Sequence, residues 1–423
     1  MQSPSKGHDV VVAGGGSAGV AAAVSAARLG AKVALVEKAG FLGGASTLRN
    51  VLTYCGFYTL GEPSRQAVLG IGEEVLSGLR RFNAVTPPQR HRGVFVAFEP
   101  EAVKRVLDDI CREAGVDVLL HSFIAGADRE NGKIKEVRYQ DHEGLHEISG
   151  HAFVDASGEG DLAWFAGAST RYGNHHMINV GSLGTRFGGV AADTEVSAQA
   201  LTEAIRAAES RGVNGLTKDA SVIARLPISG DLVCYLASAG YDARSAPSFS
   251  KAEADGRKQA WAYLEVLRTL PGCEKAYLVS TGPEFGTRES RHINSAGQLL
   301  WADVETGRTT IDSVALGAWG VEWHDWKTFQ STFKAPPGGT AYGIPLSCLR
   351  SVDTSNLFAA GRTADGDEQA GASLRVMGTA FATGQAAGVA AAHLAQDGGR
   401  LDATKVRTSL RSQGAAIGIE DLR

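Results

Sequence analysis

The stretch that decides the fold is HDVVVAGGGSAGVAAAVSAARLGAKVALVEK, residues 8–38. An apolar run ends in three consecutive glycines, a stretch of small residues follows and stops at Gly30, and a second apolar run ends at Glu37. Short apolar runs bounded by turn signals are typical of buried strands, and the alanine-rich stretch between them favours a helix. The sequence therefore predicts a β-α-β unit at the start of the chain.

The glycines between the first strand and the helix follow the pattern G-x-G-x-x-G. Gly14 permits a tight turn, Gly16 lets a pyrophosphate approach the backbone, and Gly19 lets the helix touch the strand. Ser17 and Ala18 open the helix, whose unpaired N–H groups and positive dipole suit phosphate groups. In this strand-to-helix context the pattern indicates dinucleotide binding.

Glu37 lies eighteen residues after Gly19, at the end of the second strand. A carboxylate there accepts hydrogen bonds from ribose hydroxyls and repels a 2′-phosphate, which leaves NAD and FAD as candidates. The alternative interpretation is a glycine turn with a solvated glutamate. Lys38 and AGFLGGAST follow, and a second glycine pair, Gly43 and Gly44, would bring backbone close to a longer ligand. This favours FAD.

Composition excludes several classes of protein. The chain has 423 residues, a net charge of −4 and 53 glycines, with no cluster of Lys or Arg, so nucleic acid and anionic membrane are not expected partners. The N-terminus carries no signal sequence and no apolar stretch spans a bilayer, so we expect a cytoplasmic protein without membrane insertion. The five cysteines are too far apart for a CxxC pair, and we expect no metal site.

Further elements follow from helical and strand patterns. Residues 99–115 predict a helix that buries Cys111, and residues 116–126 predict a strand. Residues 194–279 contain two amphipathic helical patterns, flanked by segments that read as strands of a second sheet. Residues 371–395 predict one long helix, in which Gly384 and Gly388 lie one turn apart for close packing.

Six segments occur in an order that resembles one known family. They are VEKAGFLGGAST, FEPEAVKRVLDDICREAGVDVLL, FVDASGEGDLAWFAGA, GTRESR, YGIPLSCL and NLFAAGRTADG with SLRVMGTAFATGQAAG. The chain resembles bacterial FAD-dependent oxidoreductases of the glutathione-reductase superfamily, close to the fumarate-reductase-like branch. The resemblance implies an α/β fold: a Rossmann-like FAD-binding domain of glutathione-reductase type (1–180 and 331–423) with an inserted α+β substrate or cap domain (181–330).

The resemblance also implies which residues hold FAD. Glu37 and Lys38 would lie at the adenosine ribose, and Ile124 would meet the adenine through its backbone. The second glycine pair would line the pyrophosphate and ribitol, Asp365 would lie near the ribitol, and the helix opening at Met377 would aim N–H groups at the flavin pyrimidine ring. Together with the glycine motif, the implied cofactor residues are Glu37, Lys38, Gly43, Gly44, Ser46, Ile124, Asp155, Ala156, Ser157, Gly158, Gly361, Arg362, Asp365, Met377, Gly378 and Thr379.

The sequence contains no second strand–GxGxxG–helix unit, since GIGEEV at residues 70–75 lacks the third glycine. We therefore expect the substrate itself to reduce the flavin: hydride passes from a small alcohol, sugar-like or carboxylated molecule to flavin N5, and oxygen, a quinone or a carrier protein removes the electrons. Two alternatives stay open. One is an NAD(P)H-dependent flavin reductase or hydroxylase, and the other is a non-catalytic flavin-binding or electron-relay protein.

Two residues are candidates for the chemistry. His324 could take the proton of a hydroxyl or amine, although a satisfied structural histidine is an equal alternative. Arg288 could hold a substrate carboxylate with two hydrogen bonds, or form an internal ion pair with Glu289 or another acid. For the adjacent His175 and His176, the open alternatives are substrate contact and covalent attachment of the flavin. Cys55 is interpreted as a small buried residue, with a flavin thioether or reactive thiol as the alternative.

Overall fold

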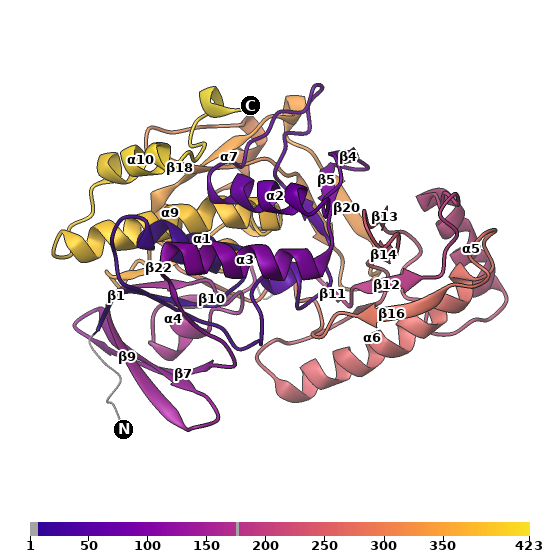
Figure 1. The fold of residues 1–423 in the computed structure, drawn as a ribbon, viewed down its shortest axis with the longest axis horizontal. Coiled ribbons are helices and arrows are strands. Elements are labelled where there is room, and N and C mark those ends of the chain that lie inside the picture. The colour runs from indigo at the N-terminus through magenta and orange to yellow at the C-terminus, as the bar shows by residue number, and fades with distance from the viewer. Residues whose placement is uncertain (1–6, 175–176) are drawn as a thin grey trace.

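A seven-stranded sheet forms the centre of the larger part of the protein (Figure 1). The computed structural model describes residues 7–174 and 177–423. The strand order is β6-β2-β1-β9-β8-β7, with β22 also paired to β9. These strands are β1 (His8–Ala13), β2 (Val33–Val36), β6 (Asp117–Leu119), β7 (Phe123–Glu130), β8 (Lys133–Gln140), β9 (Leu145–Asp155) and β22 (Leu357–Ala359). Strands β6, β2, β1, β22 and the end of β9 pair in parallel, whereas β7, β8 and the start of β9 form an antiparallel meander.

The predicted β-α-β unit is confirmed. Helix α1 (Ser17–Ala27) connects β1 to β2, and both strands are buried because helices and loops cover the two faces of the parallel sheet. Helix α9 (Met377–Gln396) packs against α1. A Cβ atom added at Gly384 or Gly388 would lie 2.1 Å from the carbonyl oxygen of Ala18 or Ala22, respectively. The prediction that these glycines allow close packing is therefore confirmed.

Helices α2 (Ile71–Arg81) and α3 (Pro100–Ala114) pack against each other and against α1. Helix α3 has the predicted bounds: Pro100 lies in the first turn, and Gly115 ends the helix with a φ of 74°. Cys111 is buried in the main hydrophobic core, as predicted. A three-stranded antiparallel sheet, β3 (Thr53–Cys55), β5 (Val94–Ala97) and β4 (Gln89–Arg90), lies beside these helices.

Two predicted elements are each divided in the structure. Residues 116–126 form parts of two strands, β6 and β7, because the chain turns at His121, which has a φ of 54°. The single helix predicted over residues 371–395 is interrupted: α8 (Glu368–Leu374) ends, Val376 is extended, and α9 begins at Met377. The break gives α9 an N-terminus of its own in the protein interior.

The prediction of one second sheet from the segments around the helical block was wrong. Strand β12 (Thr185–Gly188) belongs to a four-stranded sheet, whereas β17 (Arg291–Ile293) pairs with β10 (Thr170–Tyr172). Part of the segment predicted as strand after β17 forms helix α7 (Trp301–Thr306) instead. Short apolar runs do not specify their pairing partner, which tertiary contacts decide.

A second hydrophobic core lies between Ile178 and Phe285. It contains the two predicted amphipathic helices, α5 (Ala198–Ser210) and α6 (Ala246–Leu267), and the sheet β13-β14-β12-β16. The new strands in that sheet are β13 (Ile223–Arg225), β14 (Leu232–Cys234) and β16 (Tyr277–Thr281). This part extends from one side of the protein, with α6 running beside β16 (Figure 1). The division of the chain at residues 181 and 330 stays a prediction.

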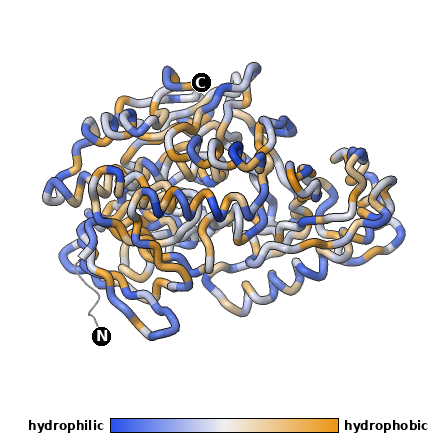
Figure 2. The backbone as a smooth tube through the Cα atoms, in the orientation of Figure 1, coloured by the Kyte–Doolittle hydropathy of each residue, from blue (hydrophilic) through white to orange (hydrophobic). Residues whose placement is uncertain are grey.

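Shorter pairs complete the fold. They are β11 (Gly181–Ser182) with β15 (Ser238–Ala239), β18 (Ser313–Gly317) with β21 (Tyr342–Pro345), and β19 (Val321–His324) with β20 (Ser331–Lys334); the remaining helices are α4 (Asp161–Phe165) and α10 (Ala403–Ser412). Figure 2 shows hydrophobic residues gathered in the interior around the large sheet. None of the helices in the described ranges has the length and apolar character needed to cross a bilayer.

Candidate functional site

The three glycines of the motif have different surroundings. A Cβ atom at Gly19 would lie 1.7 Å from the carbonyl oxygen of Gly14, and one at Gly14 would lie 2.5 Å from that of Ala156. A Cβ atom at Gly16 would meet only the Cα of Gly44, at 3.8 Å. Packing therefore requires Gly14 and Gly19, whereas Gly16 leaves bare backbone beside an open space.

The second glycine pair lies against the first loop. The N–H of Gly43 donates to the carbonyl of Gly15 at 2.9 Å, and Gly43 also forms a parallel bridge with Gly16. Ser46 is fully buried and its hydroxyl donates to the Gly43 carbonyl at 2.9 Å, so it holds the turn in place. Gly44, with a φ of 55°, approaches Gly16 closely. Two loops without side chains thus border the same space.

Glu37 is held by backbone on both carboxylate oxygens. Oε2 accepts from the N–H of Gly15 at 2.6 Å and Oε1 accepts from the N–H of Ala39 at 2.8 Å. A carboxylate has about four acceptor positions, so capacity for ribose hydroxyls is left. Lys38 forms an ion pair with Glu284 at 2.7 Å.

The loop at residues 155–158 is shaped by a buried acid. Asp155 accepts hydrogen bonds from the N–H and hydroxyl of Ser157 and from the N–H of Ala163, and burial raises the pKa of Asp155. Gly158 has a φ of 79°, and a Cβ atom there would lie 2.2 Å from Nη2 of Arg362. Asp155 therefore organises this loop, which contacts both the first glycine loop and the loop at 361–365.

The first turns of α1 and α9 converge at Gly361. A Cβ atom on Gly361 would lie 3.1 Å from Cβ of Ala18 and 3.5 Å from Cβ of Ala380. The N–H of Gly361 donates to the hydroxyl of Thr383 at 3.1 Å. Two helix N-termini, both with a positive dipole end, are thus brought together.

Two implied cofactor residues are engaged by protein groups. Asp365 accepts hydrogen bonds from Ser295 and Gln298 and pairs with Arg171 at 2.8 Å. Ile124 is buried in β7. Their contacts with ribitol and adenine stay predictions.

Two buried hydroxyls test whether these loops fit FAD. Oγ of Ser17, in the first turn of α1, and Oγ1 of Thr379, in the first turn of α9, are buried without a hydrogen-bond partner in the described residues. Buried polar groups are normally paired. A ligand with phosphate oxygens and a polar ring would satisfy both, and the open backbone at Gly16 leaves room for it. The residues present therefore fit the predicted cofactor.

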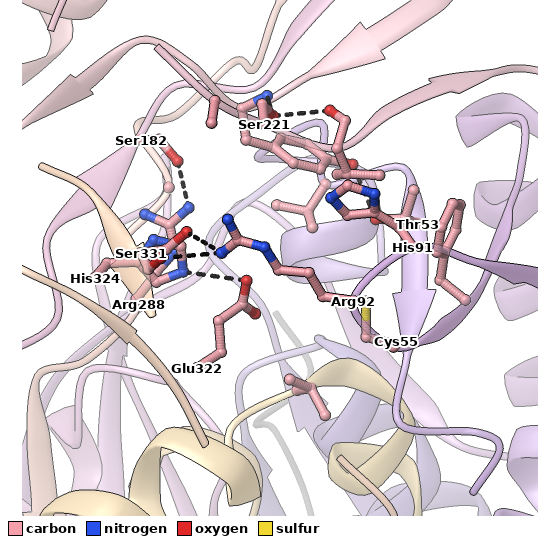
Figure 3. A pocket seen from close by; sticks show the side chains of 18 of the residues that line it. Thr53, Cys55, His91, Arg92, Ser182, Ser221, Arg288, Glu322, His324 and Ser331 are labelled. Carbon is pink, nitrogen blue, oxygen red and sulfur yellow. Dashed lines mark hydrogen bonds and ion pairs between the residues drawn. The ribbon is translucent and has the colours of Figure 1, made fainter. Parts of the chain in front are cut away.

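A cavity of about 520 Å³ borders these loops. Ala45, Arg362 and Met377 lie in its wall, next to residues implied to hold the cofactor, and other parts of the wall come from α5 and from the segment before β13. Figure 3 shows Arg288, Glu322 and Arg92 facing into this cavity from different strands and loops. The cavity therefore lies between the loops implied to hold FAD and the part of the protein that contains the second hydrophobic core.

Arg288 is a buried cation in the wall of the cavity. Its Nη1 donates to the carbonyl of Val180 at 2.6 Å and its Nη2 donates to Oγ of Ser182 at 2.7 Å (Figure 3). Glu289, the predicted internal partner, bonds instead to Asn179 and His292. No acid pairs with Arg288 among the described residues, and burial, with Arg375 nearby, lowers its pKa to about 10. An anionic ligand would compensate this charge.

Residues 9–410 match the family model described as FAD dependent oxidoreductase. The chain belongs to this family. FAD is therefore the cofactor of this oxidoreductase, in agreement with the glycine loops and the two unpaired hydroxyls.

Solved structures of low sequence identity are similar to this oxidoreductase. A geranylgeranyl bacteriochlorophyll reductase-like protein from Thermoplasma acidophilum has 13% identity and a TM-score of 0.48, covering 96% of this chain and 82% of its own. The flavin-dependent brominase Bmp2 has 13% identity and a TM-score of 0.49, covering 96% and 83%. CabE, an aromatic hydroxylase from angucycline biosynthesis, has 14% identity and a TM-score of 0.49, covering 96% and 66%. A search of curated protein sequences gave no match.

Further cations of the oxidoreductase line the cavity that sequence reasoning missed, among them Arg92, Arg375 and Lys218. Nη1 of Arg92 donates to the carbonyl and hydroxyl of Ser331 at 3.0 Å, and Nη2 of Arg375 donates to the carbonyl of Glu322 at 2.9 Å. Lys218 is buried, and its ammonium has no described partner. Arg375 lies in the quoted segment SLRVMGT, so its place before the helix was an available signal. Lys218 lies in irregular sequence, and nothing in its neighbourhood distinguished it.

His324 lies at the end of β19, in the cavity wall. Its Nε2 is 3.6 Å from Oε1 of Glu322, and its Nδ1 is buried without a partner among the described residues. Burial, followed by the charges of Arg288 and Lys218, holds the pKa of His324 well below its ordinary value. The imidazole is therefore neutral at physiological pH and can exchange hydrogen bonds with a ligand.

Cys55 also lines the cavity (Figure 3). Burial raises the pKa of its thiol far above the ordinary value, so the thiolate that nucleophilic chemistry needs is not formed at neutral pH. This favours the interpretation of Cys55 as a small packing residue. His175 and His176 lie outside the described residues. No group of acids, histidines and cysteines with metal-binding geometry occurs in the described ranges.

Proposed function

We propose that this FAD-dependent oxidoreductase is a dehydrogenase or oxidase of a small organic molecule that carries a carboxylate beside an alcohol or amine. The observation that supports this most directly is Arg288, a buried guanidinium in the cavity wall without an acidic partner in the described residues. The placement in the fumarate-reductase-like branch of the glutathione-reductase superfamily belongs to the same proposal, and it rests on the sequence resemblance.

FAD, when bound, supplies a two-electron acceptor that takes hydride from a carbon atom. The residues proposed to hold it are those of the glycine motif, Gly14, Gly16, Ser17, Ala18 and Gly19, with Glu37, Lys38, Gly43, Gly44, Ser46, Ile124, Ala156, Ser157, Gly158, Gly361, Arg362, Asp365, Met377, Gly378 and Thr379. Phosphates would meet the first turn of α1, where Ser17 is unpaired.

The carboxylate of the substrate is held by Arg288. The carbonyl of Val180 accepts from Nη1 of the guanidinium and Oγ of Ser182 accepts from Nη2, so the plane of the group is fixed. The remaining N–H groups stay available to a ligand. A fixed, planar donor pair suits a carboxylate and orients the rest of the molecule. Arg375 and Arg92 add positive charge to the same cavity.

His324 contacts the reacting end of the substrate. Its imidazole is neutral and carries one N–H, so it can donate a hydrogen bond to the oxygen or nitrogen of a hydroxyl or amine, and its unpaired Nδ1 gains a partner when the cavity is filled. The apolar part of the wall, with Val51, Phe95 and Trp319, limits the water that enters once a ligand is bound.

The test is a spectrum of the purified protein, followed by anaerobic addition of a panel of 2-hydroxy acids, amino acids, neutral alcohols, sugars, NADH and NADPH. We expect a flavin spectrum that a carboxylated compound bleaches and that its amide analogue does not. A colourless protein that binds no added FAD would contradict the assignment of the cofactor. Bleaching by NADH or NADPH alone would instead favour a reductase or hydroxylase.

Arg288→Met tests the carboxylate contact. We expect KM for the carboxylated compound to rise by about two orders of magnitude, which corresponds to about 3 kcal/mol, because the anion loses its charged partner. Arg288→Lys keeps the charge but not the planar donor pair, so it should restore only part of the affinity. Arg81→Met, at an exposed position on α2, is the matched control and should leave KM unchanged.

A further inference from the structure

We propose that Lys218 is the proton acceptor of the reaction, a role that rests on the proposed oxidation of a carboxylated alcohol or amine. The side chain lines the cavity from the irregular segment between α5 and β13. It is 4% exposed, and in the described parts of the chain its ammonium has neither an ion pair nor a hydrogen bond.

The backbone of this segment is fixed by helix α6. Oη of Tyr263 accepts from the N–H groups of Thr217 at 2.9 Å and Lys218 at 2.8 Å, and it donates to the carbonyl of Lys218 at 2.8 Å. One turn earlier on α6, Gln259 accepts from the hydroxyl of Thr217 at 2.7 Å. Tyr263 therefore holds the N–H of Thr217 and both the N–H and the carbonyl of Lys218, although this segment has no regular secondary structure. The position of Lys218 in the cavity wall is thus well defined.

The charges around the amine come from four elements. Arg288, before β17, and Arg92, between β4 and β5, disfavour the ammonium, whereas Glu322 on β19 favours it. Cys234 on β14 would favour it only as a thiolate, and burial raises the pKa of that thiol to about 11. Burial is the largest influence, and together these groups lower the pKa of Lys218 to about 7. His324 faces the same amine from β19 as a neutral imidazole. An amine in this range is partly neutral at physiological pH, which is the condition for a general base.

His324 is the weaker acceptor of the two. Burial, followed by the charges of Arg288, Lys218, Arg375 and Arg92, keeps its pKa well below 6.5, so protonating it is unfavourable throughout the neutral range. The efficiency of a general base is greatest when its pKa lies near the working pH. Lys218 meets this condition, and His324 is left to hold the substrate by a hydrogen bond.

The proposed step transfers one proton. The neutral amine of Lys218 takes the proton of the substrate hydroxyl or amino group and becomes an ammonium. The electron pair of the broken O–H or N–H bond forms the new carbon–oxygen or carbon–nitrogen π bond. The hydrogen on the same carbon leaves as hydride, with its electron pair, to the two-electron acceptor already assigned. The substrate is oxidised by two electrons, and the proton later leaves Lys218 to solvent.

The first test needs no substrate. In the FAD-loaded protein, trace acetic anhydride is applied between pH 5 and 11, and peptide mass spectrometry measures acetylation of Lys218 relative to the exposed Lys135. We expect the reactivity of Lys218 to rise with an apparent pKa of about 7. A midpoint near 10.4, the ordinary value for lysine, would overturn the proposal.

The second test separates proton transfer from charge. Lys218→Arg keeps a cation that does not release its proton, and Lys218→Met removes the charge. With the carboxylated compound from the panel, both variants should lose about 10²- to 10⁴-fold in kcat, and the inflection of kcat/KM near pH 7 should disappear. His324→Gln should keep that inflection. Titration with oxalate, followed by flavin absorption, should give wild-type affinity for Lys218→Arg and weaker binding for Lys218→Met.

The outcomes distinguish the two proposals. A Lys218→Arg variant with wild-type kcat would show that the residue supplies only charge and would overturn the role as proton acceptor, while leaving the proposed oxidation intact. A panel in which no carboxylated compound reduces the flavin would overturn the proposed function and this role with it, whatever value Lys218 shows on acetylation.

Discussion

The glycines of the first loop are required for different reasons, some for packing within the protein and one for the approach of a ligand. Gly14 and Gly19 are surrounded by backbone atoms that leave no room for a side chain. Gly16 has extended backbone angles, a φ of −72° and a ψ of −175°, that any residue adopts, and only the Cα of Gly44 lies near the position of its missing Cβ. Packing alone therefore does not explain the absence of a side chain at Gly16, and the proposed approach of FAD to this backbone would account for it.

Gly16→Ala and Gly19→Ala should therefore behave differently. We expect Gly16→Ala to change the free energy of unfolding of the FAD-free protein by no more than about 0.5 kcal/mol, and to weaken FAD binding by about tenfold or more. Gly19→Ala should destabilise the FAD-free protein by roughly 1–3 kcal/mol, because the new methyl group collides with the Gly14 carbonyl. Urea unfolding and FAD fluorescence measure the two quantities. Wild-type FAD affinity in Gly16→Ala would contradict the assignment of this space to the cofactor.

At the scale of elements, the contact between α1 and α9 positions the proposed cofactor site. Alanines on α1 face glycines on α9, so the two helix axes approach closely and both N-termini meet at Gly361. The break at Val376 matters here, because it places an N-terminus of α9 at the site instead of the middle of a longer helix.

Gly384→Ala tests this contact, with Gly371→Ala as the matched control. Alanine is favoured over glycine in a helix by about 1 kcal/mol, so Gly371→Ala should be neutral or stabilising, since its Cβ would meet nothing closer than 3.7 Å. In Gly384→Ala the Cβ would lie 2.1 Å from the Ala18 carbonyl. We expect a loss of roughly 1–3 kcal/mol in thermal unfolding and weaker FAD binding. Equal stability of the two variants would show that α1 can move away from the new methyl group without a loss of unfolding free energy.

At the scale of the whole protein, a buried charge network joins the cofactor loops to the second hydrophobic core. Arg49 pairs with Glu159 at 3.0 Å and with Glu284 at 2.6 Å, and Arg362 pairs with the same Glu159 oxygen at 2.9 Å. Burial raises the pKa of Glu159, but Arg362 and Arg49 outweigh it and hold that pKa far below its usual range. Glu284 lies just after β16, so its bond with Arg49 ties the four-stranded sheet to the loops that are proposed to hold FAD.

Glu159→Gln should destabilise the protein by about 3–5 kcal/mol at pH 7, because two buried guanidiniums lose a carboxylate. Glu101→Gln, which breaks an exposed pair with Lys104, is the control and should change stability by less than about 1 kcal/mol.

The contribution of Glu159 to the free energy of unfolding decreases as the pH falls. Its pKa is lower in the folded than in the unfolded protein, so its contribution is complete above pH of about 4.5 and decreases as the pH falls below that value. The difference in unfolding free energy between wild type and Glu159→Gln should therefore be constant from pH 6 to 8 and smaller at pH 3.5. A difference that grows on acidification would contradict the assigned pKa direction.

The strongest predictions from sequence concerned local features. The β-α-β unit, α3 and the packing role of Gly384 were predicted, because helix period, strand length and turn glycines act over a few residues. The pairing of β12 and β17 was predicted wrongly, and the break before α9 was missed. Both depend on contacts between segments far apart in the chain, which single-segment patterns do not contain.

The sequence by itself determined that this chain binds a dinucleotide and, with the later loops, that the dinucleotide is FAD. A strand, a glycine turn and a helix dipole are adjacent in the chain, so their chemistry can be read in order. Only the tertiary structure decided the chemistry of the cavity, because Lys218, Arg288 and Glu322 come from separate elements. The charge state of a buried side chain depends on how far water is excluded and on which groups lie near it in space. The order of residues in this sequence contains neither kind of information.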